Sequence, residues 1–296
     1  MTIKHLVING GGPNMWYMYG ALKHLSDEKF WSIKDIENIY ATSAGALLLT
    51  VILLIKDWSQ IDNFLINCTW NKYIDISIDR LFILLKKKGM YDIKLYQQIL
   101  KPLLEMNNMT LDTTMKEFYE FSNVNTYFFS SNLDRFTYVS ISNISHPDLP
   151  LISALQMTSA VPPIIEPVNY NDETYFDGAL FYNYPLKPCV DNENINADEI
   201  LALKNMENST TVNSLTQQDT FFDYISIMLK KFIMKSDNMC IQPKIKHELH
   251  LMFKSTIDYD YWIKILSDKT YRESIKQDGI KCAKLFLPSN GQVGFW

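Results

Sequence analysis

The feature that most constrains this chain is a serine among small residues, at the point where one apolar segment ends and a longer one begins. Ala41-Thr42-Ser43-Ala44-Gly45 follows the segment Ile36 to Tyr40 and precedes an apolar run that ends at Ile55. This order is typical of a nucleophile elbow, in which a strand ends, the chain turns sharply and a helix begins at the serine. The turn requires small residues two before and two after the serine, and Ala41 and Gly45 are small. An ordinary helix N-cap is the alternative interpretation of Thr42-Ser43.

A glycine cluster near the start of the chain is the second constraint. Gly10-Gly11-Gly12 follows the predicted strand Ile3 to Asn9 and precedes a predicted helix with apolar residues from Met15 to Leu25. Glycines between a strand and a helix let the backbone approach an anion or an oxyanion closely. A dinucleotide fingerprint is the competing interpretation, but it requires a further glycine where this chain has Met15. Nucleotide binding is therefore not favoured.

The order of elements predicts the fold class. Strand, glycine turn, helix, strand, elbow and helix imply a parallel sheet covered by helices on both faces, an α/β three-layer sandwich. Both the glycine turn and the elbow then lie at the carboxyl ends of strands, where such folds place their sites. Further along, residues 56–122 have interrupted helical patterns, Asn125 to Ser130 and Phe136 to Ile141 predict a hairpin, and Ala197 to Lys204 predicts a buried strand.

The last third of the chain carries fewer signals. A polar stretch at 205–219 predicts a mobile loop, and residues 241–296 predict helices with a candidate strand at His250 to Phe253. Between them lies an amphipathic helix, Phe221 to Met234, whose apolar face comprises Phe221, Ile225, Met228, Leu229 and Phe232. We expect that face to pack on the core; contact with a lipid surface is the alternative. Residues 1–204 are thus expected to form a core, and 205–296 a mainly helical extension packed on the same domain.

An aspartate completes the candidate site. Tyr175-Phe176 predicts a short strand that ends at Asp177, and Gly178-Ala179 lets the chain turn immediately. An ordinary turn residue is the common role of an aspartate in such a place. Like the glycine cluster and Ser43, it lies at the end of a predicted strand, and the three pieces stand together.

In combination these motifs resemble the patatin-like family of lipid acyl hydrolases, which carries a glycine-rich oxyanion loop, a Gly-x-Ser-x-Gly elbow and an Asp-Gly-Gly/Ala motif. The likeness extends in order and spacing to further segments over residues 3–204: Gly89-Met90-Tyr91-Asp92, Ser131 to Ser140, Ala154 to Pro167 and Asn183-Tyr184-Pro185. Two segments depart from the family pattern. Ala41 stands where the elbow has glycine, and Pro13-Asn14-Met15-Trp16 where the loop continues with a basic residue and a glycine.

The resemblance implies a phospholipase A-type esterase that works through an acyl-enzyme intermediate without histidine. Ser43 would be the nucleophile and Asp177 its general base. Backbone N–H groups of Gly10, Gly11, Gly12 and Ala44 would form the oxyanion hole. Phospholipid or another acyl lipid would be the substrate, with transient contact to a membrane surface. Two alternatives stay open: a soluble carboxylesterase for short acyl esters, and a catalytically degenerate lipid-binding or scaffold protein.

Composition excludes several other classes. The net charge of −5 argues against nucleic acid as a partner. The four cysteines contain no CxxC pair, which argues against a zinc site and a disulfide framework, and we expect neither metal nor cofactor. We see no signal peptide, and the apolar run from Ala44 to Ile55 is too short to span a bilayer. We therefore expect an intracellular protein, soluble or peripheral at membranes.

Overall fold

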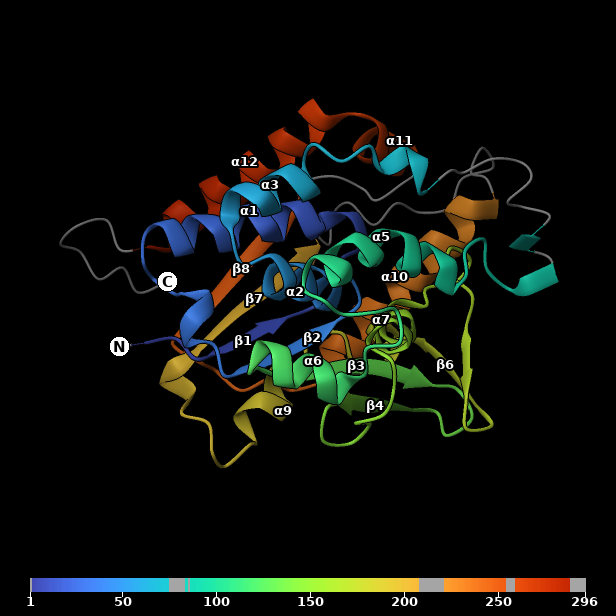
Figure 1. Ribbon diagram of the computed structural model, residues 1–296, viewed down its shortest axis with the longest axis horizontal. Helices are drawn as coiled ribbons and strands as arrows, with labels where there is room; N and C mark the ends of the chain where they lie inside the picture. Colours follow the sequence, from blue (N-terminus) through green and yellow to red (C-terminus); the bar gives the residue numbers. More distant parts are fainter. Residues whose placement is uncertain (1, 75–82, 85, 208–220, 254–258, 288–296) are drawn as a thin grey trace.

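The computed structural model describes residues 2–74, 83–84, 86–207, 221–253 and 259–287. Its centre is a sheet in which, among these residues, eight strands pair (Figure 1). The strands are β1 (His5–Ile8), β2 (Asn38–Thr42), β3 (Asn125–Asn132), β4 (Thr137–Ser142), β5 (Val168–Tyr170), β6 (Glu173–Asp177), β7 (Ile200–Glu207) and β8 (His247–Phe253). Their order is β5-β6-β3-β2-β1-β7-β8, with β4 also paired to β3.

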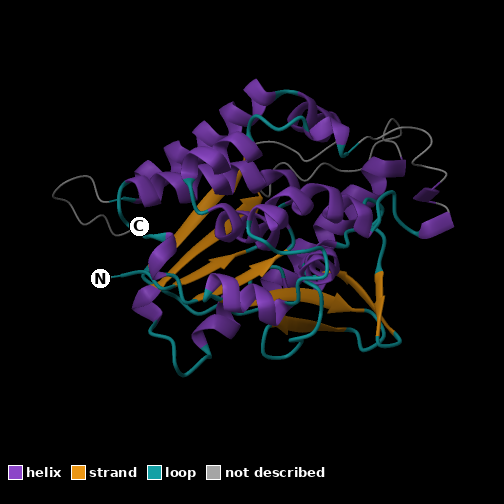
Figure 2. Cartoon of the chain, in the orientation of Figure 1, coloured by secondary structure: helices purple, strands orange, loops and turns teal. Residues whose placement is uncertain are grey.

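The predicted parallel α/β class is confirmed. Strands β3, β2, β1, β7 and β8 run parallel to one another, and an antiparallel edge of β4, β5 and β6 continues the sheet from β3. Helices flank this sheet (Figure 2). They are α1 (Met15–Asp27), α2 (Ala44–Ile55), α3 (Trp58–Leu65), α5 (Ile93–Met106), α6 (Met115–Ser122), α7 (Leu151–Ser159), α8 (Ala179–Tyr182), α9 (Leu186–Val190), α10 (Phe221–Met239), α11 (Tyr259–Ser267) and α12 (Lys269–Phe286).

The alternation of side chains along the parallel strands explains why both faces are covered. Leu6 and Ile8 of β1 belong to the large apolar cluster beneath α1, α2 and α12, whereas Val7 belongs to a smaller cluster with residues of α8 and α9. Successive residues of a strand point to opposite faces, so a strand that is apolar throughout must be buried on both. The result is three layers.

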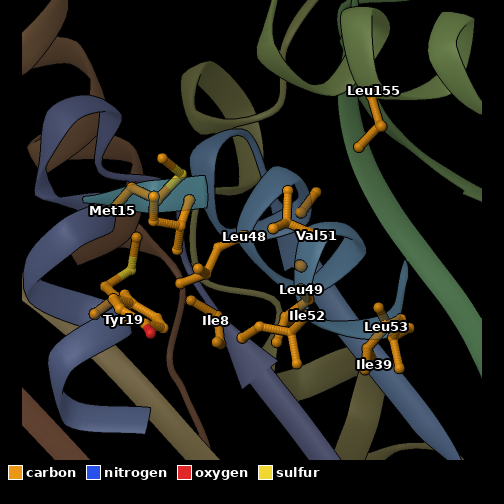
Figure 3. Packing of buried hydrophobic residues seen from close by; sticks show 14 of the residues in the cluster. Ile8, Met15, Tyr19, Ile39, Leu48, Leu49, Val51, Ile52, Leu53 and Leu155 are labelled. Carbon is orange, nitrogen blue, oxygen red and sulfur yellow. The ribbon is translucent and has the colours of Figure 1, made fainter. Parts of the chain in front are cut away.

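Helix α2 is the central element of the large cluster. Its mostly apolar sequence leaves almost no residue for solvent, as expected of a helix buried on all sides. Leu48, Leu49 and Ile52 of α2 pack in the same cluster as Ile8 of β1, and Tyr19 of α1 lies on the side of Ile8 that faces away from Ile52 (Figure 3). This packing fixes the start of α2, where Ser43 lies, relative to β1 and β2.

Several element boundaries differ from the prediction. The second strand runs to Thr42, directly into the elbow, instead of ending at Tyr40. Strand β5, which pairs with β6, was not predicted, because its three residues are partly polar and lie at the edge of the sheet. The candidate strand near His250 exists but begins at His247. The predicted loop at 205–219 falls mainly on residues 208–220, which lie outside the described residues, as do 75–82 and 85 of the interrupted helical stretch.

The C-terminal third is joined to the core by backbone pairing and by helix packing. Strand β8 extends the central sheet in parallel with β7, and α12 packs along α1. The two helices approach to backbone contact: a Cβ on Gly279 would lie 2.0 Å from the carbonyl oxygen of Tyr17, and one on Gly20 would lie 2.0 Å from that of Lys276. We therefore propose that residues 1–204 and the described part of 205–296 form one domain.

The α1–α12 contact yields a stability prediction. Alanine favours a helix over glycine by about 1 kcal/mol, so Gly279→Ala would stabilise an isolated helix. In the folded chain the added methyl group meets a backbone carbonyl, and we expect the free energy of unfolding to fall by about 1–3 kcal/mol. Urea denaturation followed by circular dichroism measures this change. Gln277→Ala, at an exposed position of the same helix, is the control and should have little effect; a stabilised Gly279→Ala variant would contradict the close packing.

Candidate active site

Ser43 occupies a strained turn between β2 and α2. Its backbone has φ 53° and ψ −126°, a conformation that L residues rarely adopt and that is often found at functional sites. Its side chain makes no hydrogen bond to the first turn of α2, so the N-cap interpretation does not hold. Its backbone N–H instead donates to Oγ1 of Thr158 at 3.0 Å. The turn therefore directs the hydroxyl away from the helix.

Close backbone contacts explain why the elbow requires small residues. A Cβ on Gly45 would lie 2.7 Å from the carbonyl oxygen of Asn9, so that position excludes any side chain. Ala41 is completely buried at the end of β2 and already carries a methyl group there. The departure from the glycine of the family pattern is thus accommodated in this fold.

Asp177 lies directly against the serine. The Ser43 hydroxyl donates to Oδ2 of Asp177 at 2.6 Å, and Oδ1 accepts the backbone N–H of Ala179 at 2.8 Å. The carboxyl group is only 3% exposed. Burial raises the pKa of Asp177 to about 6, although the hydrogen bonds from Ser43 and Ala179 favour its ionised form. A carboxylate with that pKa can accept a proton near neutral pH.

The sheet places Asp177 beside Ser43. Strand β6 pairs with β3 so that Asp177 lies opposite Ser130, and Oγ of Ser131 donates to the carbonyl oxygen of Asp177 at 2.8 Å. The N–H of Asp177 donates to the carbonyl of Ala160 at 3.0 Å. The next residue, Gly178, passes so close to β3 that a Cβ would lie 2.1 Å from the carbonyl oxygen of Phe129. The backbone of Asp177 is thus fixed by hydrogen bonds to β3 and to Ala160, and the close packing of Gly178 fixes the chain directly after it.

The glycine cluster lies beside the elbow, but its three residues are not equivalent. A Cβ on Gly10 would lie 3.0 Å from that of Ser43, which places the loop against the serine. The N–H of Gly10, however, donates to Oδ1 of Asn183 at 2.9 Å, so the expectation that it serves as an oxyanion donor is corrected. The N–H groups of Gly11, Gly12 and Ala44 make no hydrogen bond with any described residue.

A cavity of about 370 Å³ opens onto these residues. Gly10 to Gly12, Ser43 and Asp177 lie in its wall, and most of the remaining wall is apolar, including Leu47, Trp70, Leu95, Ile99, Val161 and Ile164. A largely apolar cavity with a few polar groups gathered at one place is the usual form of a ligand site. Within the described residues that line it there is no histidine. The shape and chemistry suit an acyl chain.

Part of the cavity wall comes from the C-terminal third, which the sequence assigned no chemical role. Leu229, Ile233 and Met234 of α10 and Trp262 and Leu266 of α11 line it. The predicted apolar face of α10 is therefore only partly correct: Leu229 faces the cavity, but Phe232 is 61% exposed. The side chain of Phe221 lies outside the described residues. A helical pattern alone does not distinguish a face that lines a cavity from one that packs on a core.

Two residues that position the site were missed. Thr158 joins the elbow to β3, because its hydroxyl receives the N–H of Ser43 and donates to the carbonyl of Phe129. Oδ1 of Asn183 accepts a hydrogen bond from the N–H of Gly10. Both lie in segments that carry the family resemblance, which was the available signal, but Ser43 and Gly10, the site residues that they bind, are more than a hundred residues away in sequence.

Other kinds of site find no support in the part of the chain that is described. Within it, no three histidine, cysteine, aspartate or glutamate side chains converge in a way that would hold a metal ion. None of the helices described has both the length and the apolar character needed to cross a bilayer.

Comparison with known proteins relates the chain to a family and to viral sequences. A family model described as Patatin-like phospholipase matches residues 6–190. The chain is 24% identical over 225 residues to "Uncharacterized protein R571" of Acanthamoeba polyphaga mimivirus, covering 75% of this chain and 73% of that protein. It is 23% identical over 190 residues to "Probable lipid hydrolase 463L" of Invertebrate iridescent virus 6, covering 62% of each.

A solved structure is similar in fold. VipD from Legionella pneumophila matches 96% of this chain with a TM-score of 0.53 and 14% sequence identity. This chain covers 66% of VipD and 62% of the iridescent virus protein. At such low identity the likeness to VipD concerns the fold alone. The family match ends before β7, so the cavity wall formed by α10 and α11 lies outside it.

The buried carboxyl group makes folding stability depend on pH. The pKa of Asp177 is raised from 3.8 to about 6 in the folded chain, so folding favours the protonated form. That contribution is complete below the unfolded pKa and is lost as the pH rises through the folded pKa. Asparagine does not titrate, so Asp177→Asn should stabilise the chain more at pH 8 than at pH 4.5, by about 2 kcal/mol. Denaturant unfolding at both pH values measures this; the exposed Asp148→Asn is the control, and an equal effect at both would contradict the shift.

Proposed function

This chain belongs to the patatin-like phospholipase family, and on that premise we propose that it is a lipid acyl hydrolase of the phospholipase A type with Ser43 and Asp177 as its catalytic dyad. The observation that carries the proposal is the buried 2.6 Å hydrogen bond from the serine hydroxyl to the carboxylate, in the wall of a largely apolar cavity. The similarity to a protein named probable lipid hydrolase agrees with it.

The proposed reaction has two steps. In the first, Oδ2 of Asp177 takes the hydroxyl proton as Oγ of Ser43 attacks the ester carbonyl. The tetrahedral intermediate then collapses, the leaving alcohol takes that proton from Asp177, and an acyl-serine remains. In the second step a water molecule gives its proton to Asp177 and attacks the acyl carbonyl. The new tetrahedral intermediate collapses, Oγ of Ser43 takes that proton back from Asp177, and the product leaves as a carboxylic acid.

The developing oxyanion needs donors that are already in place. We assign this role to the N–H groups of Gly11, Gly12 and Ala44, which have no described hydrogen-bond partner. Ala44 is the first residue of α2, whose positive dipole end favours negative charge there. Removal of one such donor typically lowers the rate about 100- to 1,000-fold.

A lipid substrate is favoured over a short soluble ester by the cavity. Its wall is apolar over most of its area, and a cavity of about 370 Å³ exceeds what a small acyl group would fill. We also propose transient contact with a lipid surface, since Tyr224 and Phe232 of α10 are exposed on a helix that borders the cavity. Comparing hydrolysis of phospholipid vesicles with that of p-nitrophenyl butyrate separates this proposal from the soluble carboxylesterase.

Covalent labelling tests the dyad and excludes the degenerate lipid-binding protein. A fluorophosphonate lipid analogue is expected to form one adduct, mapped to Ser43 by peptide mass spectrometry and absent in Ser43→Ala. Asp177→Asn should slow labelling by about 100- to 10,000-fold, because it removes the general base. Ser274→Ala, at an exposed serine, is the matched control. Folded wild-type protein without an adduct would overturn the hydrolase proposal, and unchanged labelling of Asp177→Asn would overturn the assigned base.

The pH dependence of turnover follows from the same group. Only the ionised form of Asp177 can accept the serine proton, and its pKa is raised to about 6. Hydrolysis of p-nitrophenyl butyrate should therefore rise as the pH increases from 4.5, by about tenfold per unit at first, and level off above a midpoint near that pKa. A rate that is constant from pH 4.5 to 8 would contradict proton transfer to Asp177.

A further inference from the structure

A residue of α10 reaches the glycine loop through a single intervening side chain. Nδ2 of Asn183 donates to Oδ2 of Asp237 at 3.4 Å, and Oδ1 of the same amide accepts the N–H of Gly10 at 2.9 Å. Asn183 is buried, so neither contact is readily replaced by water. These two hydrogen bonds, Asp237 to Asn183 and Asn183 to Gly10, thus connect the C-terminal third to the loop beside Ser43.

The orientation of the Asn183 amide is the feature that this chain of contacts controls. Gly10 presents a donor to one end of the amide, and Asp237 presents an acceptor to the other. If the amide rotated by half a turn, its NH₂ group would face the N–H of Gly10 and its oxygen would face the carboxylate. Both contacts would then be repulsive. The carboxylate therefore selects the orientation that holds Gly10.

The surroundings of Asp237 favour its acceptor role. Burial raises the pKa of Asp237 to about 6, whereas the Asn183 hydrogen bond and the attraction of Lys204 favour the ionised form. Above that pH the contact to Asn183 is a hydrogen bond to a charged acceptor, which is stronger than one between neutral groups. Asp237 also lies in the wall of the cavity, on the same stripe of α10 as Leu229 and Ile233.

Neighbouring residues keep α10 in place at this point. Oγ of Ser236 donates to the carbonyl oxygen of Phe181 at 3.0 Å, and Nε2 of Gln242 donates to that of Tyr184 at 3.2 Å. The segment from Asp177 to Tyr184, which carries both the candidate base and Asn183, is therefore tied to α10 and to the residues that follow it. Since α10 lies beyond the family match at 6–190, these contacts join the matched segment to the C-terminal third.

We propose that Asp237 is a positioning residue for the oxyanion loop: it fixes the amide of Asn183, which holds Gly10 and so sets the N–H groups of Gly11 and Gly12 relative to Ser43. The effect on catalysis rests on the proposed function, whereas the effect on the loop does not. Asp237 touches no reacting atom. Its loss should therefore lower the rate of the chemical step and leave substrate binding largely intact, since small displacements of oxyanion donors act on the transition state.

The test compares Asp237→Leu, which removes the acceptor, with Asp237→Asn, which keeps an acceptor oxygen without the charge. Lys235→Leu, at an exposed position of the same helix, is the control. The first readout is hydrogen exchange of the Gly10 amide, measured by NMR on the full chain. We expect exchange to accelerate by about 2- to 10-fold in Asp237→Leu, the loss of one hydrogen bond. The amides of Leu6 and Ile8 should stay protected, and Asp237→Asn should restore most of the protection.

The second readout is hydrolysis of p-nitrophenyl butyrate by the same variants. We expect kcat to fall by about tenfold in Asp237→Leu, with KM changed by less than about twofold, and to recover in Asp237→Asn. Unchanged exchange at Gly10 in a folded Asp237→Leu variant would overturn the inference, whatever the activity. Faster exchange at Gly10 together with equal loss of protection in β1 would also overturn it, since that indicates general destabilisation. If the wild type hydrolyses no ester, the proposed function fails, and the exchange measurement still decides the loop contact.

Discussion

The hydrogen bond between Ser43 and Asp177 is the interaction around which the site is built. It joins the turn after β2 to the end of β6, two points 134 residues apart in sequence, and it lies where water hardly reaches. Burial is unfavourable for a carboxylate, and two hydrogen bonds offset part of that cost, one from the hydroxyl of Ser43 and one from the N–H of Ala179. The same burial raises the pKa of Asp177, which suits its proposed role as a base. The burial that costs folding free energy is thus also the burial that gives Asp177 the pKa its proposed role requires.

The rest of the fold limits how far that pair can move. Gly45 and Gly178 let the backbone of the elbow and of the Asp177 turn pass within contact distance of neighbouring carbonyl groups. Thr158 links the elbow to β3, because its hydroxyl accepts a hydrogen bond from the N–H of Ser43 and donates one to the carbonyl oxygen of Phe129. Because these contacts are backbone to backbone or short side chain to backbone, they leave little freedom for the dyad. This restricted freedom suits the proposed reaction, in which the Asp177 carboxylate serves as base in both steps.

The C-terminal third contributes part of the wall of the cavity that the family segment lines. Residues of α10 and α11 form part of the cavity wall, and Asp237 reaches the glycine loop through Asn183. The cavity wall is thus divided between a segment that carries the family motifs and one that lies beyond the family match. The dimensions of the cavity therefore depend on both segments, and the proposed role of Asp237 links the C-terminal third to the glycine loop beside Ser43.

The amino-acid sequence by itself determined the α/β class and the candidate residues Ser43, Asp177 and Gly10 to Gly12. Strand periodicity, glycine positions and small residues around a serine are local properties, and the physical requirements of a sharp turn can be recognised from neighbours in the chain. Only the tertiary structure decided which N–H groups of the loop are unoccupied, which face of α10 lines the cavity, and which residue orients Asn183. Each of these depends on partners separated by tens to hundreds of residues, such as Gly10 with Asn183 and Asn183 with Asp237. A helical apolar stripe or a lone aspartate has the same local pattern whether it faces a core, a cavity or solvent, and only packing distinguishes them.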